Sequence, residues 1–173
     1  MNLSNKIDAT ANVVTIAASV LLSAVLIKAY LAPDLGTRRP TAIPMVNAEA
    51  GTSLKDRIPG VDWKRNGKTL VLAISTRCHF CTESAPFYRR VQEEAGKGVK
   101  IVAVLPQSTS ESEEYLKGEG VRVDQVRQVE LGNIGVAGTP TMLLVNSGGV
   151  VTRLWSGKVQ PEEEDTVLKA LKG

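Results

Sequence analysis

The sequence predicts an α/β domain in which helices flank a mixed β-sheet. Two short apolar runs, 69–75 and 99–105, have the length and composition of buried strands, and helical segments follow each of them. Two further strand-like runs, 141–146 and 150–155, are joined by Ser-Gly-Gly at 147–149, which favours a hairpin. Strands linked by helical crossovers are parallel, whereas hairpin strands are antiparallel, so the predicted sheet is mixed.

Three segments are expected to form the helices. The run 82–95 has helical character interrupted at Pro86, and 108–117 opens with Ser and Thr caps that acidic residues follow. The last helix, 161–171, has proline in its first turn and acids at 162–165 near its positive end. The predicted order is strand, helix, strand, helix, irregular segment, hairpin, helix.

Composition excludes several classes of protein. The chain has 173 residues, 21 Lys plus Arg and 18 Asp plus Glu, and a net charge of +3 without a dense basic stretch argues against a nucleic-acid-binding protein. The 43% hydrophobic content excludes a disordered chain or collagen. Two cysteines cannot make a disulfide scaffold, and with one histidine we expect no four-ligand zinc site and no metal.

The first 32 residues are expected to form a membrane anchor. Residues 9–27 carry no charge, and nineteen helical residues roughly match the hydrocarbon core of a bilayer. Lys28 can reach the interface by snorkelling, which extends the membrane segment to residues 9–32, and Tyr30 would lie near the headgroups. A cleaved signal peptide would have a shorter apolar region with a small-residue cleavage site directly behind it.

A linker and one folded domain are expected after the anchor. Segment 33–50 contains Pro33, Pro40 and Pro44 and lacks a sustained period, so we expect it to hold the domain away from the membrane. The remaining residues, 51–173, are enough for a single domain.

The motif that carries chemistry is Cys78-His79-Phe80-Cys81, which follows the predicted strand 69–75 and opens the next helix. Free backbone N–H groups at that helix end favour a thiolate, and the first Cys of such pairs typically has a pKa lowered from about 8.5 to roughly 3.5–7.5. A thiolate attacks disulfides and a second thiol resolves the mixed disulfide. We therefore expect Cys78 to be the nucleophile and Cys81 the resolving thiol.

Three neighbours of the cysteines are expected to support the site. Arg77 adds positive charge beside Cys78, and His79 could stabilise the thiolate when protonated, although an exposed histidine often has no such role. Phe80 is interpreted as an apolar surface for substrate or as a packing residue.

A single Cys-x-x-Cys pair also fits other functions. It could be half of a metal site, a static clasp, or the loop of a copper carrier, a binding module without turnover. Copper carriers usually place Met two residues before the first Cys, where this chain has Thr76. A peroxiredoxin-like peroxidase would need proline at position 71, which is Val71.

A second motif favours redox exchange. Gly138-Thr139-Pro140-Thr141 precedes the predicted hairpin. With the Cys pair after a buried strand, Pro86 five residues beyond Cys81, and the closing helix, the chain resembles the thioredoxin superfamily over 54–173. The resemblance implies that the proline is cis and lies against the dithiol, and that the backbone of Thr139 holds substrate. Together with the anchor, these features look most like the membrane-tethered TlpA/ResA-like thioredoxins of bacteria.

The chain departs from the thioredoxin pattern at two positions. Arg77 stands where tryptophan is common, and Leu72 stands where thioredoxins bury an aspartate that accepts and returns a proton. Glu83 could replace that aspartate, although an ordinary exposed helix glutamate is the simpler interpretation.

These observations predict a membrane-tethered thiol–disulfide oxidoreductase. Its expected partners are protein thiols or disulfides and a redox donor or acceptor, and the redox-active Cys78–Cys81 pair takes the place of a cofactor. The sequence leaves open the direction of electron flow, the reduction potential, the substrate and the oligomeric state.

Two observations disagree on the side of the membrane on which residues 51–173 lie. Lys6 and the amino terminus precede the uncharged run 9–27, and Lys28, Arg38 and Arg39 follow it, which by the positive-inside rule favours a cytoplasmic domain. The form of a signal anchor and the resemblance favour the opposite side. We expect a single-pass protein of the bacterial cytoplasmic membrane with residues 51–173 in the periplasm or outside the cell.

Overall fold

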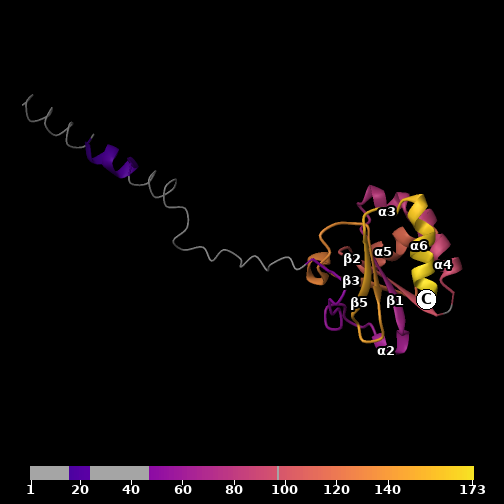
Figure 1. Cartoon of the computed structure of the whole chain (residues 1–173). Helices are drawn as coiled ribbons and strands as arrows, with labels where there is room; N and C mark the ends of the chain where they lie inside the picture. The colour runs from indigo at the N-terminus through magenta and orange to yellow at the C-terminus, as the bar shows by residue number, and fades with distance from the viewer. Residues whose placement is uncertain (1–15, 24–46, 97) are drawn as a thin grey trace, which may run out of the picture. The chain divides into compact units, whose positions relative to one another are not determined.

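The chain divides into two compact units, Met1–Ile43 and Pro44–Gly173. The computed structural model describes residues 16–23, 47–96 and 98–173 (Figure 1).

The first unit is described only over residues 16–23, which are helical. Apolar side chains such as Ile16 and Leu21 are exposed on this helix. The rest of the expected anchor, 1–32, and most of the expected linker, 33–50, lie outside the described residues. Within the ranges that are described, no helix is both long enough and apolar enough to cross a membrane.

The second unit is built on a five-stranded sheet with the order β3-β2-β1-β4-β5. The first three strands are mutually parallel, whereas β4 runs antiparallel to both β1 and β5, so the predicted mixed sheet is confirmed. The strands are β1 (Lys68–Ala73), β2 (Val99–Leu105), β3 (Gln125–Gln128), β4 (Thr141–Val145) and β5 (Val151–Ser156).

The observed helices differ from the predicted ones in two ways: the helix after the cysteines is divided at a different residue, and two short helices, α2 and η1, were not predicted. The helix expected over 82–95 begins at His79 and is divided at Ser84, which ends one helix and caps the next, while Pro86 lies in the first turn of the second. The helices of the second unit are α2 (Trp63–Asn66), α3 (His79–Glu83), α4 (Ala85–Glu94), α5 (Thr109–Gly118), the 3₁₀ helix η1 (Leu131–Ile134) and α6 (Pro161–Lys172).

Alternation along β1 gives the sheet two packed faces. Leu70 and Leu72 belong to the core cluster that includes residues of α4, α5 and α6. Val71 and Ala73 belong to the opposite cluster, which residues of the segments 48–63 and 129–136 complete. Both faces of β1 are covered, and the strand is apolar from Leu70 to Ala73, as is usual for a central parallel strand, although Thr69 is a buried polar residue at its start.

The sequence suggests that the folded unit begins at Gly51, but residues before Gly51 already pack against it. Ala48 is buried, and its backbone N–H donates to the carbonyl oxygen of Gly135 at 2.6 Å. Residues 47–50, interpreted from the sequence as linker, are therefore part of the packed unit.

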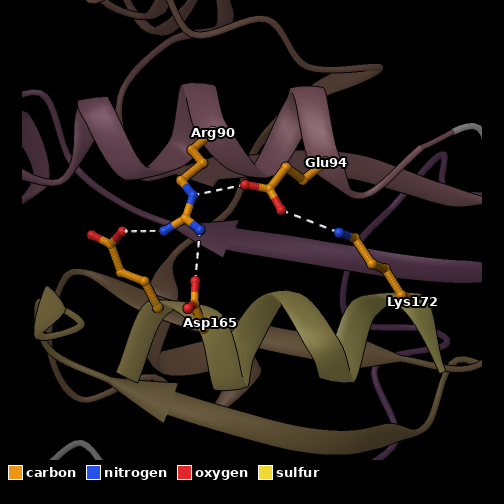
Figure 2. Close-up of polar contacts among 5 residues, drawn as sticks. Arg90, Glu94, Asp165 and Lys172 are labelled. Carbon is orange, nitrogen blue, oxygen red and sulfur yellow. Dashed lines mark hydrogen bonds and ion pairs between the residues drawn. The ribbon is translucent and has the colours of Figure 1, made fainter. Parts of the chain in front are cut away.

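A charged network joins α4 to α6, which lie side by side (Figures 1 and 2). Arg90 on α4 contacts Glu94 at 2.7 Å, Glu164 at 3.0 Å and Asp165 at 2.6 Å. Lys172 contacts the other oxygen of Glu94 at 3.1 Å. These contacts link the C-terminal helix α6 to α4, the helix that follows α3.

Candidate active site

Cys78 and Cys81 form a disulfide at the start of α3, beyond the carboxyl end of β1. Cys78 is the N-cap of the helix, and its Sγ accepts a hydrogen bond from the backbone N–H of Cys81 at 3.1 Å. The helix starts here because an N-cap side chain satisfies a backbone donor that has no partner within the helix. After reduction the same N–H would stabilise negative charge on Cys78.

The two sulfur-bearing residues differ in exposure. Cys81 is 0% exposed and packs in the core cluster with Leu72. Cys78 is partly exposed and packs against the rim of that cluster. An incoming thiolate can therefore approach Cys78 more readily than Cys81.

The loop before β4 lies against Cys78. The Sγ of Cys78 is 3.4 Å from the backbone carbonyl oxygen of Thr139, and the Thr139–Pro140 peptide bond is cis, as the resemblance implied. The hydroxyl of Thr141 donates to the carbonyl oxygen of Gly138 at 2.8 Å, which closes the loop on itself. Pro140 is buried and Thr139 is partly exposed, so the threonine backbone borders the disulfide at the surface.

Arg77 and Phe80 lie on the outside of the site. Both are exposed, and Phe80 retains 57% of its surface although it is a large apolar residue. The rings of Phe80 and His79 are tilted against each other with their centroids 5.8 Å apart. The surface around Cys78 therefore includes a cation from Arg77, which precedes it in sequence, and an apolar ring from Phe80, which follows it.

Glu83 connects His79 to Lys158. The Nε2 of His79 is 3.0 Å from one carboxylate oxygen of Glu83, and Lys158 donates to the other at 2.8 Å. Lys158 and then His79 hold the pKa of the Glu83 carboxyl below its ordinary value. Glu83 is exposed, which supports its interpretation as a surface glutamate. Leu72, at the position where thioredoxins bury an aspartate, is buried and cannot accept or return a proton. Within the described ranges no group of three His, Cys, Asp or Glu side chains could hold a metal ion.

Three residues that the sequence analysis did not single out contact the cysteine loop. Gln107, just after β2, binds Ser75 and Thr76, while Glu111 and Tyr115 on α5 bind Thr76 and Thr82. A signal for Gln107 existed in the sequence: β1 and β2 are consecutive strands joined by a crossover, so their carboxyl ends meet at one edge of the sheet.

Three solved structures with a similar fold are described as thiol–disulfide proteins. A candidate thiol:disulfide interchange protein DsbE from Chlorobium tepidum is 20% identical, with a TM-score of 0.58, covering 73% of this chain and 100% of that one. A thiol-disulfide isomerase from Corynebacterium glutamicum is 12% identical, with a TM-score of 0.53, covering 75% and 96%.

A thioredoxin family thiol:disulfide interchange protein from Chlorobium tepidum is 20% identical, with a TM-score of 0.50, covering 64% of this chain and 83% of that one. No protein-family model and no curated protein sequence matches this chain. At these identities the likeness concerns the fold: the second unit of the chain has a thioredoxin-like fold.

Proposed function

We propose that this chain is a thiol–disulfide oxidoreductase in which Cys78 exchanges disulfides with protein partners and Cys81 resolves them. The observation that carries the proposal is the unequal exposure of the two cysteines in a helix-capping disulfide: Cys81 is fully buried and Cys78 is reachable. A static clasp requires no such difference. The descriptions of the structural neighbours as thiol–disulfide proteins agree with this function.

The exchange proceeds in two displacements. In the reducing direction, the Cys78 thiolate attacks one sulfur of a partner disulfide, forms a mixed disulfide and releases the other partner sulfur as a thiolate. Cys81 then loses its proton, attacks Cys78 and releases the second partner thiolate. Two electrons pass from the dithiol to the partner, and the Cys78–Cys81 disulfide of the structure is restored. The oxidising direction is the same sequence in reverse.

The surface beside Cys78 supports recognition of an extended partner segment. The Thr139 carbonyl oxygen, 3.4 Å from the Cys78 sulfur, is placed to accept a backbone hydrogen bond from a partner whose cysteine has reached Cys78. Phe80 offers exposed apolar area and Arg77 an exposed cation. In this proposal both select among partners, and Pro140 supports the Thr139 backbone from within the fold.

The proposed location is the outer side of a bacterial cytoplasmic membrane, with residues 9–32 as tether. The support is the uncharged run 9–27 and the exposed apolar side chains on the helical residues 16–23. Alkaline phosphatase fused after Gly173 should be active, because that enzyme needs an oxidising compartment to form its disulfides. An inactive phosphatase fusion beside a fluorescent cytosolic reporter fusion would place the domain inside the cell.

Turnover tests the catalytic part of the proposal. The full-length chain, supplied with reduced glutathione, should reduce a disulfide-linked peptide over many cycles, and Cys78→Ser should abolish this activity. Stoichiometric Cu(I) binding by the reduced chain without any turnover would instead favour a binding module.

A further inference from the structure

Three side chains spaced four residues apart form a polar row beside the cysteine motif. Gln107 precedes α5, and Glu111 and Tyr115 lie on that helix. Residues four apart on a helix lie on one face, so Glu111 and Tyr115 point in the same direction. The row contacts the chain both before Cys78 and after Cys81.

Gln107 makes the contacts closest to Cys78. Its amide nitrogen donates to the hydroxyl of Ser75 at 3.0 Å, and its amide oxygen accepts from the backbone N–H of Thr76 at 3.4 Å. Ser75 in turn accepts from the two residues that follow Thr76: its hydroxyl from the N–H of Arg77 at 3.3 Å and its carbonyl from the N–H of Cys78 at 3.1 Å. Gln107 is therefore hydrogen-bonded to Ser75, the residue whose carbonyl oxygen accepts from the backbone N–H of Cys78.

Glu111 and Tyr115 extend the row along the motif. The hydroxyl of Thr76 donates to the carboxylate of Glu111 at 2.8 Å. The hydroxyls of Tyr115 and Thr82 are 3.1 Å apart, which connects α5 to α3 at the residue after Cys81. The motif is thus held at both ends by one neighbouring segment.

We propose that Gln107 is a positioning residue that keeps Cys78 at the helix cap after the disulfide opens, with Glu111 and Tyr115 in support. Two donor thiols, which are oxidised to a disulfide, supply two electrons and one proton to the pair, which leaves a thiolate on Cys78 and a thiol on Cys81. In the disulfide form the Cys78 sulfur is 3.1 Å from the Cys81 backbone nitrogen. The thiolate is stabilised by this N–H only if the Cys78 side chain keeps that position after reduction. Gln107 thereby lowers the pH at which Cys78 becomes reactive and makes the potential more oxidising. This inference rests on the proposed function of the pair.

Gln107→Met isolates this effect because glutamine and methionine have similar volume and neither is charged. The charged and titratable groups around the motif are Arg77, His79, Glu83, Lys158, Glu111 and Tyr115, and the substitution replaces none of them.

Gln92→Met is the matched control. Gln92 is also partly buried and also joins two segments, donating to the Tyr88 carbonyl oxygen at 2.9 Å and accepting from the Arg122 N–H at 2.7 Å, but it lies on α4 away from this row. Both variants should lose similar stability, and only Gln107→Met should alter Cys78.

The measurement is the rate of Cys78 alkylation by iodoacetamide against pH in the reduced full-length chain, with the midpoint potential against glutathione. In Gln107→Met the midpoint of the pH profile should rise by about 0.5 to 1 pH unit, the size that the loss of one ordinary hydrogen bond produces, and the potential should become more negative. Thr76→Val, which removes only the hydroxyl bond to Glu111, should move the profile in the same direction by a smaller amount.

Two outcomes separate this inference from the proposed function. If the parent chain shows a reversible dithiol but Gln107→Met and Thr76→Val match Gln92→Met in both readouts, the positioning role is wrong and the oxidoreductase proposal stands. If the parent pair cannot be reversibly reduced, the oxidoreductase proposal itself fails.

Discussion

The sulfur of Cys78 lies 3.4 Å from the backbone carbonyl oxygen of Thr139, sixty-one positions further along the chain. The cysteine stands at the end of a strand–helix unit and the threonine at the start of a hairpin, and the pairing of β1 with β4 brings them together, since Ala73 lies opposite Thr141. The contact between Cys78 and Thr139 therefore depends on the register of the sheet rather than on either loop alone.

Cys81→Ser should accumulate mixed disulfides through Cys78, because attack on a partner still occurs but the resolving thiol is missing. The adducts should appear on non-reducing gels and disappear after reduction. Cys78→Ser should form few adducts, since the remaining Cys81 is fully buried. Adducts that form only in Cys78→Ser would reverse the two roles.

Phe80→Ala should slow exchange with protein disulfides several-fold, because aromatic residues, Phe among them, are enriched in protein–protein interfaces and this ring is exposed two residues from Cys78. Oxidised glutathione serves as the internal control: it is too small to cover this surface, and its rate should change little. Equal loss with both substrates would show that Phe80 acts on the disulfide itself and not on partner contact.

Leu72→Ala should lower the free energy of unfolding by about 2–5 kcal/mol, because Leu72 is 1% exposed and its removal leaves a cavity beside the Cys81 cluster. Leu72→Met, which keeps most of the volume, should cost less than about 1.5 kcal/mol. Urea unfolding monitored by circular dichroism measures both. Equal, small losses would mean that this part of the core tolerates an empty volume.

Acid should weaken the link between α4 and α6 shown in Figure 2. Hydrogen bonds from Arg90 and then Lys172 hold the pKa of Glu94 below its ordinary value of 4.5. A carboxyl whose pKa is depressed by folding contributes stability above its unfolded pKa, and this contribution is lost as the pH falls through the folded pKa.

Glu94→Gln isolates this contribution. The unfolding free energy of the parent chain should exceed that of Glu94→Gln at pH 6, and the difference should shrink as the pH is lowered from about 5 towards 3. Urea titrations at a series of pH values measure it. Parallel curves for the two chains would show that the network adds no pH-dependent stability.

Much of the sheet could be predicted because its strands carry strong local signals. The run Val99–Leu105 is a strand over its full predicted length, and the break between Val145 and Val151 coincides with the Ser-Gly-Gly turn. By contrast β3, with the sequence Gln-Val-Arg-Gln at 125–128, has only one apolar residue. It is an edge strand beside β2, and its pairing, not its composition, makes it a strand.

The site shows the same division between local and tertiary signals. The Cys pair and the Thr-Pro pair are motifs that can be recognised in sequence. Nothing in the sequence distinguishes Glu83 and Lys158 from other charged surface residues. They form an ion pair because the fold places the segment before α6 beside α3. Gln107 likewise acquires its contact with Ser75 because adjacent parallel strands end at one edge of the sheet.

The most direct test of the account is a redox titration of the full-length chain in mixtures of reduced and oxidised glutathione, with the Cys78–Cys81 disulfide followed by alkylation and mass spectrometry. The account predicts one reversible two-electron transition, reached equally from the oxidised and the reduced side, with a midpoint between about −270 and −120 mV. A disulfide that stays closed throughout this range, or that fails to re-form after reduction, would contradict the account and leave the pair as a static clasp.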